Sequence, residues 1–388
     1  MARIRLNPEL LRWARKRAGR SLSDLARAFP KLETWESGES EQMPTLKQIE
    51  RFAKAVRVPI GYLFLPEPPM ERIPISDLRT IGNVHIGRPS PDLLDTIYIC
   101  QQRQEWYREF ARSNGETPLP FVGSAKLGDS IEEVATKMRN ALRFDFEGRR
   151  RMSTWTEALR CFMEQAEELG IMVMRSGVVG SNNNRRLDHD EFRGFALSDD
   201  LAPLVFINGR DTKAAQMFTL AHELAHIWLG HSALSDIEPA SLPTHQVEVW
   251  SNKVAAELLL PLGFLRSEYN EGAELEDEVN RLARRFKIST LVVLRRIHDA
   301  GKLSREEFED AYDKELARLI ALKKKRREEG GGGNFYATEW TRVGKRFARA
   351  LVTSTLEGQT LYRDAFRLLG FWKVRTFHEL SRRMEGHA

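Results

Sequence analysis

Two histidines four residues apart, His222 and His226, constrain the fold of this chain more than any other feature. Side chains at positions i and i+4 lie on one face of an α-helix, so a helix here would let both imidazoles reach one metal ion. Apolar residues recur at helical spacing around them, with no proline or glycine between Ala214 and Gly230. The sequence therefore predicts a helix that ends near Gly230 and carries both histidines on one face.

Glu223 follows the first histidine and completes an HExxH sequence. Zinc in a hydrolase usually takes three protein ligands and leaves a fourth position for water, whose pKa it lowers to about 7. Glu223 is placed to take the proton of that water and to pass it to a leaving amine. The alternative is a pair of buried histidines that bind no metal, and the helical setting favours the metal interpretation.

The third ligand is expected from a second helix, predicted over Gln246–Leu260 and ended by Pro261. Glu248 shares a face of this helix with Asn252 and with small or apolar residues, which suits packing against the first helix. Glu257 lies on another face, so we expect Glu248 to be the ligand. Four side chains between the two helices remain alternatives at this stage: His231, Asp236, Glu238 and His245.

Residues 218–226 read FTLAHELAH, and residues 248–261 read EVWSNKVAAELLLP. Together they resemble the ImmA/IrrE metallopeptidases, whose pattern is HExxH followed by ExxANxFAAxLLMP. The resemblance covers roughly residues 125 to 300. Ser251, Val254 and Leu260 replace Ala, Phe and Met of the family pattern, which are mild changes of packing residues.

This resemblance implies a zincin-like peptidase domain with a small sheet. It also implies that Zn2+ is held by His222, His226 and Glu248, with Glu223 as the catalytic residue. Three short apolar runs are candidate strands, and all three precede the motif helix: Ile171–Met174, Gly194–Leu197 and Pro203–Ile207. The polar stretch Gly180–Arg186 is expected to be a loop. An edge strand of such a sheet would favour an extended peptide as substrate.

The first 66 residues show a different pattern, a set of five short helices. Pro8–Arg17 is apolar on one face, Ser21 opens a capping box, and Thr45–Val56 and Pro59–Phe64 complete the set. With the sequence WESG at 35–38, this stretch resembles the Xre-type helix-turn-helix domain. Such a domain would make operator DNA a partner.

The resemblance departs from the family where DNA would be read. About three residues fewer than usual separate Leu25-Ala26 from Trp35, so the recognition segment is short. Arg20, Lys31 and Thr34 are the candidate DNA-binding residues. The alternative is a degenerate domain retained as a protein-binding module.

Composition and linkers indicate a multidomain protein. The 388 residues are enough for two or three domains, and 41% hydrophobic content is ordinary for a globular chain. We expect an α+β fold, mostly helical, with these parts: a Xre-like helix-turn-helix domain (1–66), a connector with an amphipathic helix (67–124), an ImmA/IrrE-like metallopeptidase domain (125–320), a basic and glycine-rich linker (321–333) and a C-terminal helical module (334–388).

Neither a membrane-spanning run of about 18 apolar residues nor an apolar signal core occurs, so a cytoplasmic protein without a membrane partner is expected. Two cysteines cannot form a disulfide framework. A net charge of +5 permits contact with nucleic acid without requiring it. A dimer is plausible, but the sequence does not determine the oligomeric state.

The predicted function is that of a zinc-dependent endopeptidase and transcriptional regulator. The family resemblance implies cleavage of a protein, a transcriptional repressor, in a bacterial stress or mobile-element response. The alternative is an antitoxin-like regulator that binds DNA and a toxin partner, with little or no proteolysis. Glu223 discriminates between them, because a structural zinc site needs no such carboxylate and closes its fourth position with a protein ligand.

Overall fold

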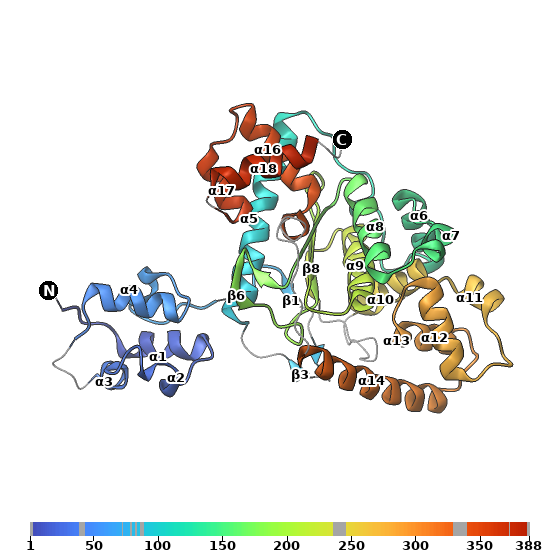
Figure 1. The fold of residues 1–388 in the computed structure, drawn as a ribbon, viewed down its shortest axis with the longest axis horizontal. Helices are drawn as coiled ribbons and strands as arrows, with labels where there is room; N and C mark the ends of the chain where they lie inside the picture. Colours follow the sequence, from blue (N-terminus) through green and yellow to red (C-terminus); the bar gives the residue numbers. More distant parts are fainter. Residues whose placement is uncertain are drawn as a thin grey trace. The chain divides into compact units, whose positions relative to one another are not determined.

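The computed structural model describes residues 3–38, 43–71, 73–77, 80–81, 84–85, 89–235, 246–328, 340–371 and 373–385. The chain divides into two compact units (Figure 1). The first unit is Met1–Pro74 with Gly87–Asp95, and the second is Ile75–Ile86 with Thr96–Ala388. The chain is mostly helical with a small mixed sheet, so the expected α+β class is confirmed. The finer domain boundaries stay predictions.

The first unit is a small helical bundle. Its helices are α1 (Pro8–Arg17), α2 (Leu22–Ala26), α3 (Leu32–Ser37), α4 (Leu46–Ala55) and the 3-10 helix η1 (Ile60–Phe64). Ser21 and Thr45 each form a capping box, in which the side chain and the third helical residue satisfy each other's backbone donors. Leu11, Trp35 and Phe52 lie in its apolar core. The helices predicted over Pro8–Arg17, Thr45–Val56 and Pro59–Phe64 are present within one residue at each end, and a helix follows the Ser21 cap as expected.

The second unit contains most of α5 (Pro91–Ser113) and all later elements. Before the metal motif these are α6 (Ile131–Leu142), α7 (Phe146–Arg151), α8 (Trp155–Glu168), β4 (Met172–Ser176), β5 (Val178–Val179), β6 (Asn182–Arg186), β7 (Gly194–Leu197) and β8 (Leu204–Asn208). They continue with α9 (Lys213–Leu229), β9 (Ala233–Ser235), α10 (Gln246–Leu259), α11 (Leu262–Glu268), α12 (Leu275–Phe286), α13 (Thr290–Asp299), α14 (Arg305–Glu328), α16 (Lys345–Leu356), α17 (Tyr362–Leu369) and α18 (Val374–Glu385).

One sheet organises this unit, with strand order β1-β9-β7-β8-β4, where β1 is Ser76–Asp77. β4 and β8 are parallel, whereas β7 runs antiparallel to both β8 and β9. Nearly every position of β4, β7 and β8 is buried, as expected of strands covered by helices. Helix α9 packs on β7 and β8, α8 packs on β4, and α10 packs on α9. The three predicted strands are present, shifted by at most two residues. The short strands β2 (Thr80–Ile81) and β3 (Val84–His85) pair apart from this sheet.

The prediction of a loop over Gly180–Arg186 is wrong for most of this segment. Asn182–Arg186 forms β6, which pairs antiparallel with β5. Its side chains are mostly exposed, so the segment needs no apolar residues to hold its backbone ladder. A polar composition is typical of loops and favours that prediction. Strand pairing, however, depends on backbone hydrogen bonds, which amino-acid composition does not reveal.

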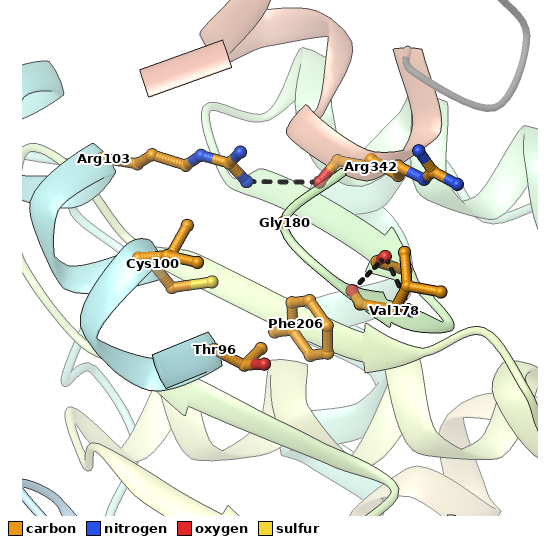
Figure 2. A pocket seen from close by; sticks show the side chains of 9 residues that line it. Thr96, Cys100, Arg103, Val178, Gly180, Phe206 and Arg342 are labelled. Carbon is orange, nitrogen blue, oxygen red and sulfur yellow. Dashed lines mark hydrogen bonds between the residues drawn. The ribbon is translucent and has the colours of Figure 1, made fainter. Parts of the chain in front are cut away.

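The C-terminal helices are packed on the second unit. Helix α16 lies against β4 and α8, and Phe347 is fully buried. Gly344 has φ of 80°, and an added Cβ would lie 2.9 Å from the Val173 carbonyl oxygen, so a close backbone approach requires glycine there. Arg103 of α5 donates to the carbonyl oxygens of Leu368 and Arg342, at 2.9 and 3.4 Å, beside a cavity of about 10 Å³ (Figure 2).

No helix in the described parts of the chain combines the length and the apolar content needed to cross a membrane. The two cysteines are free thiols, Cys100 buried and Cys161 half-buried. Burial raises the pKa of the Cys100 thiol to about 12, so this thiol is unreactive at neutral pH.

The stability of the contact between α16 and α8 should depend on pH, because Glu167 is buried in it. Burial raises the pKa of this carboxyl from 4.5 to about 7, although hydrogen bonds from the backbone of Lys345 and Arg346 act in the opposite direction. The folded state therefore binds the proton more tightly, and the stability that this proton contributes is lost as pH rises from about 4.5 to about 7. We expect Glu167→Gln to raise the unfolding temperature relative to wild type more at pH 7.5 than at pH 5.

The exposed neighbour Glu168 offers a matched control. Unfolding of the wild type, Glu167→Gln and Glu168→Gln would be followed by circular dichroism at both pH values. An equal shift for the two variants would contradict a specific role for Glu167.

Candidate metal centre

The HExxH sequence lies in α9, a helix whose ends are well defined. Thr212 caps its N-terminus by accepting a hydrogen bond from Ala215 N, and Gly230 ends it in the left-handed conformation. Every residue from Gln216 to Leu229 is buried. A helix buried on all sides can keep polar side chains only where they find partners, so the histidines and Glu223 require compensation from neighbouring elements.

The compensation for the histidines comes from Glu248 on α10. The Nε2 atoms of His222 and His226 are 2.9 Å apart, and the Glu248 oxygens lie 3.2 Å from His222 Nε2 and 3.0 Å from His226 Nε2. Both histidines are 0% exposed and Glu248 is 4% exposed. The structure therefore brings together the three residues expected to hold Zn2+, from two helices.

These donor atoms suit a divalent cation. Two imidazole nitrogens and a carboxylate form a common ligand set of catalytic zinc, and zinc–ligand bonds of 2.0–2.1 Å place tetrahedral ligands about 3.3 Å apart. The distances of 2.9 to 3.2 Å between the donor atoms are close to that separation. The three side chains form a buried group that could hold a metal ion.

Asn252 orients one of the two imidazoles. Its Oδ1 lies 2.9 Å from His222 Nδ1, so the ring donates from Nδ1 and turns the lone pair of Nε2 toward Glu248 and His226. Sequence reasoning did not assign this role, although Asn252 stands four residues after Glu248 on the same helical face. That spacing is the signal that could have identified it.

The charges in the group also suit a cation. Burial lowers the pKa of His226, which keeps this imidazole neutral at pH 7. Burial alone would raise the pKa of Glu248, but the charges and hydrogen bonds of His222 and His226 outweigh it, and the pKa is lowered. A neutral imidazole and an ionised carboxylate are the forms that bind metal.

Glu223 points toward the start of β7. It is 0% exposed, and a Cβ added to Gly194 would lie 3.0 Å from Glu223 Oε1, 2.6 Å from Thr219 Cγ2 and 2.9 Å from the Phe206 carbonyl oxygen. Only a glycine fits between the strand and the helix at this point. Gly194 is a second residue that sequence reasoning did not assign to the site.

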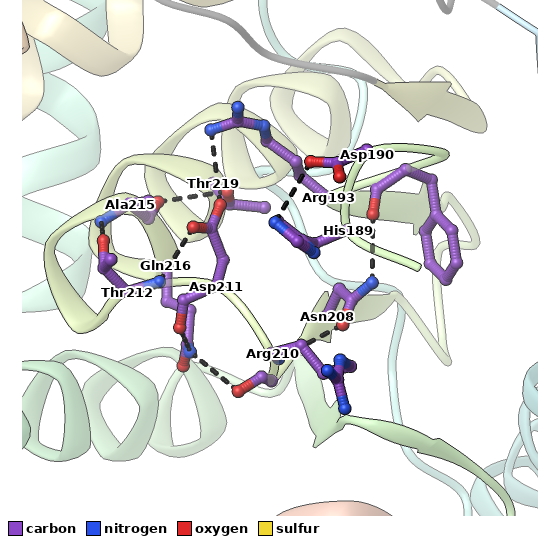
Figure 3. A network of polar contacts seen from close by, with 12 residues as sticks. His189, Asp190, Arg193, Asn208, Arg210, Asp211, Thr212, Ala215, Gln216 and Thr219 are labelled. Carbon is purple, nitrogen blue, oxygen red and sulfur yellow. Dashed lines mark hydrogen bonds and ion pairs between the residues drawn. The ribbon is translucent and has the colours of Figure 1, made fainter. Parts of the chain in front are cut away.

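Polar contacts hold the start of α9 (Figure 3). Gln216 Nε2 donates to the carbonyl oxygens of Gly209 and Asp211, at 3.1 and 2.6 Å. Arg193 forms an ion pair with Asp211 at 3.2 Å, and Asn208 donates to the Phe192 carbonyl oxygen at 3.1 Å. These contacts place the N-terminal turn of the helix against the ends of β7 and β8.

Two of the other candidate ligands, Glu257 and His231, are described by the structure, and neither is a member of the metal group. Glu257 forms an ion pair with Arg296, which also donates to the Leu260 carbonyl oxygen, so both side chains support the packing of α10 on α13. His231 is exposed, and its backbone nitrogen donates to the His226 carbonyl oxygen at 3.0 Å. The remaining three lie outside the described residues: Asp236, Glu238 and His245. A second group of Asp188, His189 and Asp190 has two exposed carboxylates.

The candidate DNA-binding residues are all in the first unit. Arg20, Lys31 and Thr34 are exposed. Two other arginines of the first unit are ion-paired: Arg15 with Glu36 at 2.8 Å, and Arg17 with Glu71 at 2.6 Å. These ion pairs leave the two guanidinium groups less able to contact phosphates, and DNA binding stays a prediction.

We expect Asn252→Ala to weaken zinc affinity about 10- to 100-fold, because the ring of His222 loses the contact that sets its tautomer and orientation. Competition with a zinc-binding dye would measure the change. Asn280→Ala is the control, since Asn280 is also a half-buried asparagine on a helix but donates only to the Glu276 carbonyl oxygen. Equal affinity in all three proteins would refute the orienting role.

Gly194→Ala should destabilise the second unit by about 1–3 kcal/mol, because the added methyl group meets the backbone of β8 and the side chains of Thr219 and Glu223. Chemical denaturation would measure the loss. Gly263→Ala is the matched control, since no atom lies within 4 Å of its added Cβ. A similar stability for both variants would mean that β7 and α9 are less tightly packed than described.

Two family models match parts of the chain. Residues 343–383 match a family model described as a domain of unknown function (DUF8813). No curated protein matches the chain. Residues 166–298 match the family model described as the IrrE N-terminal-like domain, a range that includes α9, α10 and every residue of the candidate metal centre. This match supports the ImmA/IrrE resemblance, and with it a metallopeptidase-family function, for residues 166–298.

Proposed function

We propose that this protein is a zinc-dependent endopeptidase. The observation that carries the proposal is the convergence of His222, His226 and Glu248, whose ligand atoms all lie within 4.8 Å of one another, next to Glu223 on the same helix. A structural zinc site would need a fourth protein ligand. Among the described residues, the buried group at this point has three members, the number of protein ligands that a catalytic zinc site has beside its water.

The residues of the chain have distinct roles in this proposal. His222, His226 and Glu248 would hold the cation, which when bound polarises a peptide carbonyl and makes water more acidic. Glu223 would accept a proton from the attacking water at a carboxylate oxygen and deliver it to the leaving nitrogen. Burial around Glu223 strengthens its electrostatic interactions, because the local dielectric constant is low.

An extended peptide is the substrate that best fits the sheet. β9 follows α9 directly and pairs with β7 on one side. On its other side the described part of the chain contributes the two-residue strand β1. A peptide that replaced β1 would run along β9 near the end of the motif helix, held by backbone hydrogen bonds. The substrate would be a protein, and the ImmA/IrrE resemblance suggests a transcriptional repressor.

The helical first unit supports a regulatory setting for this peptidase. A Xre-like domain that binds operator DNA or a partner protein would bring the peptidase to its substrate. Bacterial stress and mobile-element responses are the settings in which such cleavage would act, and the cytoplasm is the compartment where it would occur.

Replacing Glu223 by Gln should abolish cleavage while zinc binding is retained, because the amide cannot accept the proton of water. We expect the rate to fall by at least 100-fold, in line with the contribution of general acid–base catalysis. Cell extract would be incubated with zinc-loaded wild type or variant, and new protein N-termini would be identified by mass spectrometry. Glu132→Gln, an exposed glutamate on α6, controls for the substitution itself.

The proposal fails if the wild type and Glu223→Gln give the same N-termini while both bind zinc. That result would favour the antitoxin-like alternative, in which the chain binds a toxin and DNA and the metal group only supports the fold. Bound zinc and unfolding temperature would be recorded for each protein, so that a misfolded variant is not mistaken for an inactive one.

A further inference from the structure

A large cavity in the second unit lies apart from the metal group. It has a volume of about 930 Å³ and lies between the ends of β4 and β8, helix α8, the start of α9 and the segment 340–349. This size is in the range of small-molecule sites, about 300–1,000 Å³. The cavity therefore has room for a ligand larger than a single inorganic ion.

The wall of this cavity is rich in cations. Seven basic side chains line it, and they come from four separate segments: Arg160, Arg175, Arg210, Lys213, Arg342, Lys345 and Arg349. The acidic residues of the wall are Glu164 and Glu167. Glu164 is ion-paired with Lys345 at 2.6 Å, and burial raises the pKa of Glu167 to about 7, so neither offsets the remaining cations fully. An anion is the ligand that this wall would attract.

Two of these cations, Arg175 and Lys213, are half-buried. Arg175 donates to the side-chain oxygen of Gln216 at 3.1 Å, and in the described part of the chain it forms no ion pair with a carboxylate. Burial, together with the charge of Arg175, lowers the pKa of Lys213 to about 8. Burying like charges side by side is unfavourable unless an anion compensates them.

Two glycines bring these cations together. A Cβ added to Gly209 would lie 3.2 Å from Gly177 N, and one added to Gly177 would lie 2.9 Å from Arg210 Cγ. The turns after β4 and β8 can therefore approach closely, and this approach places Arg175 beside Lys213. Lys213 is the first residue of α9, whose N-terminal end carries a partial positive charge.

The rest of the wall is apolar and aromatic. Leu159, Met163 and Val173 line it together with the indole of Trp340. Phosphate groups suit the cationic part, while a flat heterocycle suits an indole, on which bases stack. We propose that this cavity binds a nucleoside polyphosphate, with the phosphates near Arg175, Arg210 and Lys213 and the base against Trp340.

This site is distinct from the metal group but shares its helix. His222 lies nine residues after Lys213, or roughly 14 Å at 1.5 Å per residue. A nucleotide would contact both the start of α9 and the segment 340–349, which leads into the region matched by the domain of unknown function. The C-terminal module would then serve as one wall of an effector site. The inference goes beyond the peptidase function, and its test measures binding rather than cleavage.

Isothermal titration calorimetry of the full-length protein would test nucleotide binding in this cavity, with ATP in excess magnesium as the probe. Tripolyphosphate and adenosine would separate the contribution of the phosphates from that of the base. We expect micromolar ATP binding that Arg210→Gln with Lys213→Gln weakens at least tenfold, for ATP and tripolyphosphate alike. Trp340→Leu should weaken ATP about fivefold and leave tripolyphosphate unchanged.

Lys137→Gln on α6 is the matched control, because it removes an exposed lysine from a helix outside the cavity. Arg349→Gln, at an exposed position of the cavity wall, keeps the test valid if the double variant does not fold. The proposal is overturned if neither ATP nor GTP binds, if all variants bind ATP equally, or if only a single-stranded oligonucleotide such as dT10 binds. Failure of proteolysis in the Glu223 experiment would leave this result unaffected.

Discussion

The packing of α10 against α9 is the contact on which the second unit depends. Helix α9 is buried along almost its whole length, and it carries two histidines and a glutamate into the interior. Polar groups there are costly unless they are paired. Glu248 and Asn252 on α10 supply partners for the two histidines, so one helix pair both completes the core and assembles the candidate metal centre.

The sheet determines where that helix begins. β8 ends at Asn208, and the short turn to Lys213 is held by Gln216, Asp211 and Arg193. β7 approaches α9 most closely at Gly194, where only a glycine leaves room for Glu223. The position of the proposed general base is therefore set by the distance between a strand and a helix as well as by the HExxH sequence.

The C-terminal helices add a second level of organisation. Gly344 and Arg346 bring α16 against β4 and α8, and Arg103 ties the chain before and after this helix to α5. The docked segment forms one wall of a cationic cavity at the N-terminal end of α9. The same buried helix thus joins the candidate metal centre to a surface that the C-terminal module helps to form.

Much of this architecture could be predicted from the sequence because its signals are local. Spacing at i and i+4 placed His222 and His226 on one face, and the helical face of Glu248 distinguished it from Glu257. The capping box at Ser21 and the glycine at position 230 marked helix boundaries correctly. Each of these features depends on the geometry of one helix, which a short stretch of chain determines by itself.

Only the tertiary structure decided the rest, because those features depend on residues far apart in the chain. The strand Asn182–Arg186 is held by backbone pairing that its polar composition conceals. The roles of Asn252 and Gly194 appear only when α10 and β7 are placed against α9. The cationic cavity joins Arg175, Lys213 and Trp340, and no sequence period links them. Local periodicity determines on which face of a helix a side chain lies. Tertiary packing determines which residues that face contacts.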